Sequence, residues 1–216
     1  MNARYDLIVF DWDGTLMDSE RKIVRCMSAA AADLGLADPG ADAIRQIIGL
    51  GLDEAMGELF PQAPAALRQR LTLRYREHFL SLDQTDMPLF PGVEEGLPRL
   101  AQEGFLLAVA TGKARRGLNR VLDETGTRRY FAATRCADES FSKPHPGMLE
   151  DILGQTGVPR DRALMVGDTT YDMLMARNAG IAALAVSYGV HRRAQLLECA
   201  PLGCVDSFAE ICRWVS

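Results

Sequence analysis

Cysteine is scarce in this sequence, and no two cysteines have the Cys-x-x-Cys spacing that is typical of zinc or redox sites. Their number is odd, which does not suggest a disulfide framework. The cysteines are Cys26, Cys136, Cys199, Cys204 and Cys212. We therefore expect a protein of a reducing cytoplasm that has neither a structural zinc site nor disulfide bonds.

Long apolar runs and runs of basic residues are also missing. No apolar stretch reaches the roughly 18 residues that a membrane-spanning helix needs, and residues 1–5 do not resemble a signal peptide. The net charge is −5 and the arginines form at most doublets, which argues against nucleic acid or a membrane as the main partner. We expect a cytoplasmic monomer or homodimer whose substrate is a small anionic molecule.

Short apolar runs recur along the chain, and each ends in small, hydroxyl or acidic residues, as strands buried in a parallel sheet do. They are residues 7–10, 105–110, 163–166 and 181–186, with a weaker strand at 132–136. Helical patterns separate them. This alternation predicts an α/β fold with a doubly wound, mainly parallel, Rossmann-like sheet, whose ligands bind beyond the carboxyl ends of the strands.

The alternation is interrupted between residues 16 and 85. This stretch shows four helical patterns and no convincing strand, and in the first pattern Ile23 and Met27 lie on one face. Asp18 or Ser19 can cap this first helix. The interruption predicts an all-helical insertion.

We therefore divide the chain into two domains. The core comprises residues 1–15 and 86–216, and the inserted helical cap comprises residues 16–85. Residues 86–92 contain two prolines and a glycine, which favours a linker that returns the chain to the core.

Two carboxylates follow the first predicted strand. Asp11 and Asp13 are two positions apart, so along extended backbone both project to the same side, and Gly14 permits a sharp turn after them. Such a pair needs a compensating charge, and Mg²⁺ prefers oxygen ligands and also neutralises phosphate oxygens. On its own the motif is more typical of a surface turn than of a metal site.

Other strand ends carry compatible groups. Thr111 and Gly112 offer a hydroxyl and backbone N–H groups for phosphoryl oxygens, and Lys143 offers an ammonium group beside a predicted helix start. Asp168 and Asp172 are four residues apart, so we expect them to share a helical face. Each feature alone is common at turns and caps, but together they favour a metal and phosphate site.

The ordered set of motifs resembles the haloacid dehalogenase superfamily, in the phosphoglycolate-phosphatase-like branch with a small helical cap. The motifs are Asp11-Trp12-Asp13-Gly14-Thr15-Leu16, Thr111-Gly112, Lys143-Pro144, and Gly167-Asp168 followed by Asp172. The resemblance covers essentially the whole chain. It implies a phosphatase that acts on a small phosphorylated metabolite, for example phosphoglycolate.

The resemblance also implies roles for the residues of these motifs. Asp11 would be the nucleophile that forms an aspartyl-phosphate, and Asp13 would be the general acid and base. Thr111, the N–H of Gly112 and Lys143 would stabilise charge on the transferred phosphoryl group.

The cofactor that the resemblance implies is Mg²⁺. Its ligands would be the Asp11 carboxylate, the Asp13 carbonyl and Asp168, supported by Asp172. The cap would close over the site, and Gly49 and Gly51 lie in the loop that we expect to contact substrate. An ordinary turn between helices explains these glycines equally well.

Two alternatives remain on the sequence alone. A sugar phosphomutase of the same superfamily retains both aspartates, and a non-catalytic binding module could share the fold. The module would be expected to have lost a motif residue, and none is lost here. Asp13 argues against a dehalogenase or a phosphonatase, which would not carry this second aspartate.

Overall fold

In the computed structural model, which describes residues 4–216, six parallel strands form one sheet in the order β3-β2-β1-β4-β5-β6. The strands are β1 (Leu7–Phe10), β2 (Leu106–Thr111), β3 (Phe131–Cys136), β4 (Ala163–Gly167), β5 (Ala182–Val186) and β6 (Cys204–Val205). β1 lies at the centre of the sheet, between β2 and β4. The predicted doubly wound α/β fold is thus confirmed.

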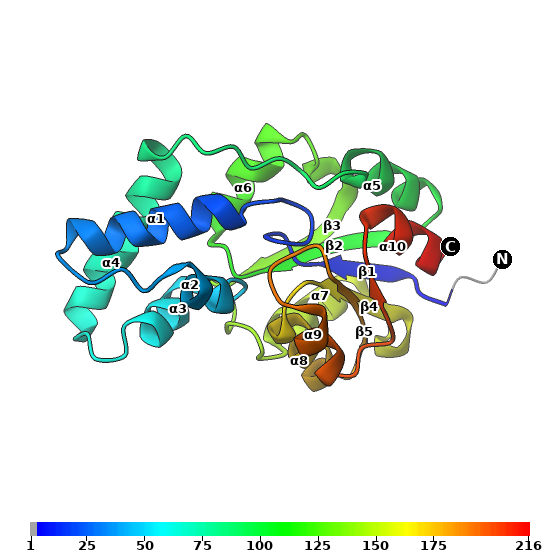
Figure 1. Cartoon of the computed structure of the whole chain (residues 1–216). Coiled ribbons are helices and arrows are strands. Elements are labelled where there is room, and N and C mark those ends of the chain that lie inside the picture. Colours follow the sequence, from blue (N-terminus) through cyan, green and yellow to red (C-terminus); the bar gives the residue numbers. More distant parts are fainter. Residues whose placement is uncertain (1–3) are drawn as a thin grey trace.

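Helices cover both faces of the sheet (Figure 1). In β1, Ile8 and Phe10 pack among the side chains of α5, α6 and α10, whereas Leu7 and Val9 pack against α7 and α8 on the opposite face. The helices are α5 (Val93–Gln102), α6 (Arg115–Glu124), α7 (Gly147–Thr156), α8 (Thr170–Ala179), α9 (Arg193–Glu198) and α10 (Phe208–Val215), with short η2 (Arg128–Tyr130) and η3 (Arg160–Arg162). Every residue of β1 is apolar, because a strand that is buried on both faces needs apolar side chains at each position rather than at alternate ones.

A second group of helices lies beside the carboxyl edge of the sheet, between β1 and α5 in the chain (Figure 1). These helices are α1 (Glu20–Asp33), α2 (Ala41–Ile47), α3 (Leu52–Leu59) and α4 (Ala65–Glu77), and α4 continues into a π-helical turn, η1 (His78–Leu82). They have an apolar core of their own, in which Met27, Ile44, Met56 and Leu71 are fully buried or nearly so. We call this group the cap; its limits at residues 16 and 85 stay a prediction.

The outgoing and returning chain segments run side by side between the cap and the core. Asp18 N donates to Pro88 O at 2.9 Å, and Phe90 N donates to Leu16 O at 2.9 Å. This double connection joins the cap to the same edge of the sheet at which β1 ends. Among the helices within residues 4–216, none combines the length and the apolar character needed to cross a membrane.

Candidate active site

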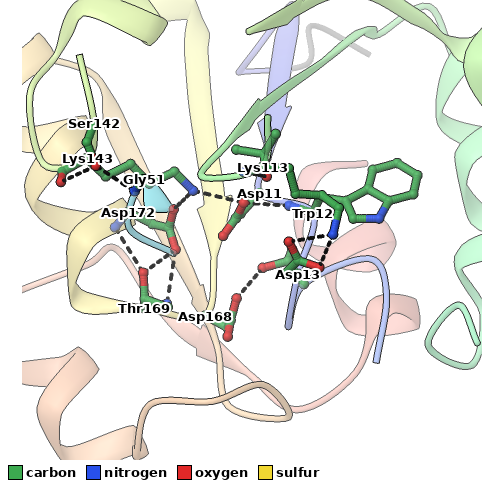
Figure 2. Close-up of polar contacts among 12 residues, drawn as sticks. Asp11, Trp12, Asp13, Gly51, Lys113, Ser142, Lys143, Asp168, Thr169 and Asp172 are labelled. Carbon is green, nitrogen blue, oxygen red and sulfur yellow. Dashed lines mark hydrogen bonds and ion pairs between the residues drawn. The ribbon is translucent and has the colours of Figure 1, made fainter. Parts of the chain in front are cut away.

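The four predicted acids and Lys143 meet at the carboxyl edge of the sheet (Figure 2). Asp11 and Asp13 follow β1, Thr111 ends β2, and Asp168 follows β4. Since β2, β1 and β4 are neighbours in the sheet, their ends bring these side chains together. Lys143 comes from the loop between β3 and α7.

Asp11 and Lys143 form a buried ion pair, in which Lys143 Nζ lies 2.9 Å from Asp11 Oδ1. The backbone N–H of Trp12 donates to the same oxygen at 2.6 Å. The other oxygen, Asp11 Oδ2, is buried and has no hydrogen-bond partner among the described residues. Burial raises the pKa of Asp11 well above its usual value, and the charge of Lys143 only partly opposes this.

Lys143 bridges two carboxylates, since its Nζ also lies 2.7 Å from Asp172 Oδ1. Burial alone would lower the pKa of Lys143, but the charges of Asp11 and Asp172 outweigh burial and raise it. Lys143 is therefore held as an ammonium ion.

Asp168 accepts hydrogen bonds from Thr15 Oγ1 at 2.7 Å and from the backbone N–H of Val190 at 2.8 Å. Burial and the nearby charge of Asp172 raise the pKa of Asp168 to about 7. The backbone of Gly14 passes close by with φ +83°, and a Cβ atom there would lie 2.1 Å from Asp168 Oδ2. Gly14 thus serves both the turn after β1 and the space for this carboxylate.

The structure corrects two local predictions. Asp168 does not share a helical face with Asp172, because α8 begins at Thr170 and Thr169 is its N-cap. Asp172 belongs to a capping box, in which its Oδ2 accepts from Thr169 N at 3.0 Å. Ser19 occupies the N-cap position of α1 but makes no capping hydrogen bond, because its hydroxyl donates to Asp13 Oδ1 at 2.6 Å.

Three buried carboxylates suit a hard divalent cation. Asp11, Asp168 and Asp172 each offer an oxygen, and these atoms lie within 4.8 Å of one another. Lys143 supplies one positive charge against three buried acids, and buried charge of one sign needs further compensation. Both oxygens of Asp168 and of Asp172 already have protein partners, whereas Asp11 Oδ2 is buried and has none among the described residues. The donor set fits Mg²⁺.

Asp13 is held by two side chains that the sequence did not place in the site. Ser19 is one of them, and Lys113 Nζ contacts both carboxylate oxygens, at 2.9 Å from Oδ1 and 3.1 Å from Oδ2. Lys113 also lies over the ring of Phe79 in the cap, 4.8 Å from its centroid. The only indication in the sequence was the position of Lys113 directly after Thr111-Gly112.

The cap touches the core through the loop that contains Gly49 and Gly51. A Cβ on Gly112 would lie 2.4 Å from the carbonyl oxygen of Leu50, so only glycine fits at this position. The N–H of Gly51 donates to Ser142 Oγ at 2.7 Å, which places Gly51 against the core loop next to Lys143. In this arrangement the Gly51 amide is engaged by the protein, and its contact with substrate stays a prediction.

A cavity of about 530 Å³ lies between this edge of the sheet and the cap. On the core side it is lined by Asp11, Asp13, Thr111 and Gly112, and on the cap side Gly49 is among its lining residues. Its size falls within the range that is usual for small-molecule sites. The cavity is therefore the place where a small substrate can meet Asp11 and Asp13.

Known proteins resemble this chain in sequence and in fold. The sequence model of the haloacid dehalogenase-like hydrolase family matches residues 8–186. The protein named "Probable phosphatase IndB" of Dickeya dadantii (strain 3937) is 38% identical over 212 residues, which cover 95% of this chain and 91% of the relative. A phosphoglycolate phosphatase of Agrobacterium fabrum (strain C58) is 31% identical over 210 residues, which cover 95% of this chain and 90% of the relative.

A crystal structure shows the same fold over the whole length. The protein, described as a predicted phosphoglycolate phosphatase from Haemophilus somnus 129pt, superposes with a TM-score of 0.91 at 24% identity and covers 100% of both chains. The family match spans most of the chain and includes all the strand ends described above except that of β6. The chain therefore belongs to the haloacid dehalogenase-like hydrolases, and it is a phosphatase of that family.

Proposed function

We propose that this phosphatase is a Mg²⁺-dependent phosphomonoester hydrolase in which Asp11 is the nucleophile. The observation that carries the proposal is the state of the two Asp11 oxygens. Lys143 and the N–H of Trp12 fix Oδ1, while Oδ2 is buried, has no partner among the described residues and belongs to a residue that lines the cavity. One oxygen is thus oriented by the protein and the other is available for attack.

In the first step, Oδ2 of Asp11 forms a bond to phosphorus as the bond from phosphorus to the ester oxygen breaks. Asp13, which also lines the cavity, gives a proton to the departing alcohol. In the second step, Asp13 takes a proton from water as that water attacks phosphorus, which releases phosphate and restores the Asp11 carboxylate.

Groups that surround Asp11 stabilise the negative charge on the phosphoryl group. Lys143 is an ammonium ion at hydrogen-bond distance from Asp11, and Thr111 and Gly112 line the same cavity. Mg²⁺, held by Asp11, the Asp13 carbonyl and Asp168 with Asp172 in support, would neutralise negative charge on the phosphoryl oxygens. Asp172 supports this set indirectly, because it fixes Lys143 and caps α8.

The substrate is a small phosphorylated metabolite. Phosphoglycolate appears in the names of several relatives, for example that of Agrobacterium fabrum. It is therefore the reference compound for a screen of phosphomonoesters with Mg²⁺.

The nucleophile is tested by Asp11→Asn, which keeps the shape of the side chain and removes its nucleophilic charge. We expect Mg²⁺-dependent release of phosphate from p-nitrophenyl phosphate to fall by about 10⁴-fold or more, while the circular dichroism spectrum is unchanged. Asp53→Asn, at an exposed acid of α3, is the matched control and should retain activity. Turnover retained in Asp11→Asn would contradict the assignment.

A further inference from the structure

The cap side of the cavity is apolar. Side chains from α1, α2, α3, α4, η1 and the loop between α2 and α3 line it, and most of these side chains are hydrocarbon. Examples are Ile23, Met27, Ile48, Leu50, Ala55 and Phe79. A substrate held against Asp11 therefore has its organic part next to hydrocarbon rather than next to charge.

The charged residues that line the cavity lie at its mouth or are already paired. Arg76, Glu77, Arg116 and Asp138 are exposed and carry both signs, so water weakens their interaction with a substrate. Lys113 is the buried cation of the lining, and Asp13 engages it through both carboxylate oxygens. A second anion on the substrate would have to compete with Asp13 for this ammonium group.

Phosphoglycolate illustrates the difficulty. A single carbon separates its carboxylate from the ester oxygen, so the carboxylate must lie near Asp13, the proton donor to that oxygen, and cannot extend to the exposed arginines at the mouth. Transfer of an unpaired carboxylate against apolar side chains is strongly unfavourable, because the charge loses its hydration and gains no partner. An apolar group at the same place gains free energy from burial.

We propose that the organic part of the preferred substrate is an apolar group of about the size of an aromatic ring, without a second anion. This inference rests on the proposed function, because it concerns the alcohol that leaves when Asp11 attacks. The cavity volume of about 530 Å³ exceeds what a two-carbon acid fills, and it suits a ring beside the phosphoryl group. Phe79 and Ile48 supply an aromatic and a branched surface for that ring.

One buried cation of the cap could argue for an acidic substrate. Lys22 is 5% exposed, and its Nζ lies 5.3 Å from the centroid of the Phe79 ring. Lys22 does not belong to the cavity lining, so it does not offer its ammonium group to a ligand there. If it nevertheless bound a substrate carboxylate, Lys22→Met would selectively weaken hydrolysis of phosphoglycolate.

The test compares phosphate release from benzyl phosphate and phosphoglycolate by the wild-type protein with Mg²⁺. Both compounds are esters of aliphatic alcohols, so a difference reports the fit of the organic part more than the ease of bond cleavage. We expect kcat/KM to be about tenfold or more higher for benzyl phosphate, the usual scale of discrimination in an apolar pocket. A higher value for phosphoglycolate, or equal values, would overturn the inference.

Variants then test whether the cap wall is responsible. Phe79→Leu and Ile48→Ala should lower kcat/KM for benzyl phosphate about tenfold. Hydrolysis of methyl phosphate, which needs the same proton from Asp13 but has only a methyl group to offer the wall, should stay within about twofold of wild type. Leu82→Ala removes an exposed cap leucine outside the cavity and should change neither value. Parallel losses on both substrates in the wall variants would show a structural effect and refute the assignment.

The outcomes also separate the inference from the function on which it rests. If the wild-type protein releases no phosphate from methyl phosphate, benzyl phosphate or phosphoglycolate, the proposed function fails and the inference fails with it. If phosphate is released in an Asp11-dependent manner but without preference for the benzyl ester, only the inference is lost.

Discussion

Lys113 is paired with the residue proposed to move protons. Its side chain is 7% exposed, and its ammonium group contacts both oxygens of Asp13, which also accepts from Ser19. Two donors from different segments of the chain, one after β2 and one before α1, fix the orientation of this carboxylate. We interpret Lys113 as a positioning residue for Asp13.

Lys113→Met keeps the length of the side chain and removes its charge. Hydrolysis of an alkyl phosphate, whose alcohol needs a proton as it leaves, should slow by about 10²-fold, the lower range for general acid catalysis. Hydrolysis of acetyl phosphate, whose leaving group needs little protonation, should change far less. Steady-state kinetics on both compounds check this. Arg70→Met, at an exposed position outside the cavity, is the matched control, and Lys113→Arg is the conservative variant that should recover part of the loss. Equal losses on the two compounds would contradict the positioning role.

The residues at the strand ends could be predicted to converge because parallel strands finish at one edge, whatever lies between them in the chain. To predict that Asp11, Thr111 and Asp168 lie close together, it was enough to assume that their strands are neighbours. The contact between Lys113 and Asp13 depends instead on how the cap and the loop after β2 pack. A local sequence pattern does not predict this packing. The same holds for Ser19, whose hydroxyl could have capped α1 and binds Asp13 instead.

At the scale of elements, apolar runs identified the strands that the sheet buries on both faces. β6 has two residues and α9 has six, so neither is long enough to show a period that a sequence pattern could reveal. The prediction that Asp168 and Asp172 share a helical face is wrong because Asp168 and Thr169 can both cap a helix in sequence terms. Only the structure shows that Thr169 is the cap and that Asp168 binds Thr15 and Val190 instead.

The end of η1 is tied to α1 by Asp83, whose carboxylate lies 3.0 Å from Arg25 Nε. Burial raises the pKa of Asp83, but hydrogen bonds from the hydroxyl and N–H of Thr85 and the charge of Arg25 outweigh burial and lower it to about 2. An aspartate in an unfolded chain has a pKa of about 3.9. The stabilising contribution of Asp83 is therefore complete above about pH 4 and is lost as the pH falls towards about 2.

Asp83→Asn should consequently lower the free energy of unfolding at pH 7, and the gap to wild type should narrow as the pH falls from about 4 to about 2. Urea unfolding at a series of pH values measures both curves. Asp86→Asn, at an exposed acid three residues further on, is the control and should leave the curve unchanged. A gap that is constant over this pH range would show that the charge of Asp83 does not contribute as we infer.

At the scale of the whole molecule, the core and the cap have different roles in the site. The sheet edge and the loops beside it bring together the acids, Lys143 and Thr111, and apolar side chains of the cap line the other side of the cavity. The sheet and its edge follow from patterns within single segments. The composition of the cavity wall does not, since it joins side chains from several helices whose mutual packing decides which of them face the cavity.

The unbalanced charge at the sheet edge links metal binding to the stability of the whole fold. Asp11, Asp168 and Asp172 are buried with one ammonium group among them, so a ligand that binds only the folded state and neutralises them must stabilise it. Mg²⁺ at about 100 times its Kd adds about 2.7 kcal/mol to the free energy of unfolding, which for a chain of this length raises Tm by about 5–10 °C.

Differential scanning fluorimetry in chelator and in Mg²⁺ measures the rise in Tm, and phosphate release should stop in chelator and return with Mg²⁺. Asp168→Asn should lose most of the rise while Asp53→Asn keeps it, because only the first change removes a carboxylate from the cluster. Equal Tm values with and without Mg²⁺, together with full activity in chelator, would exclude this cluster as a metal site.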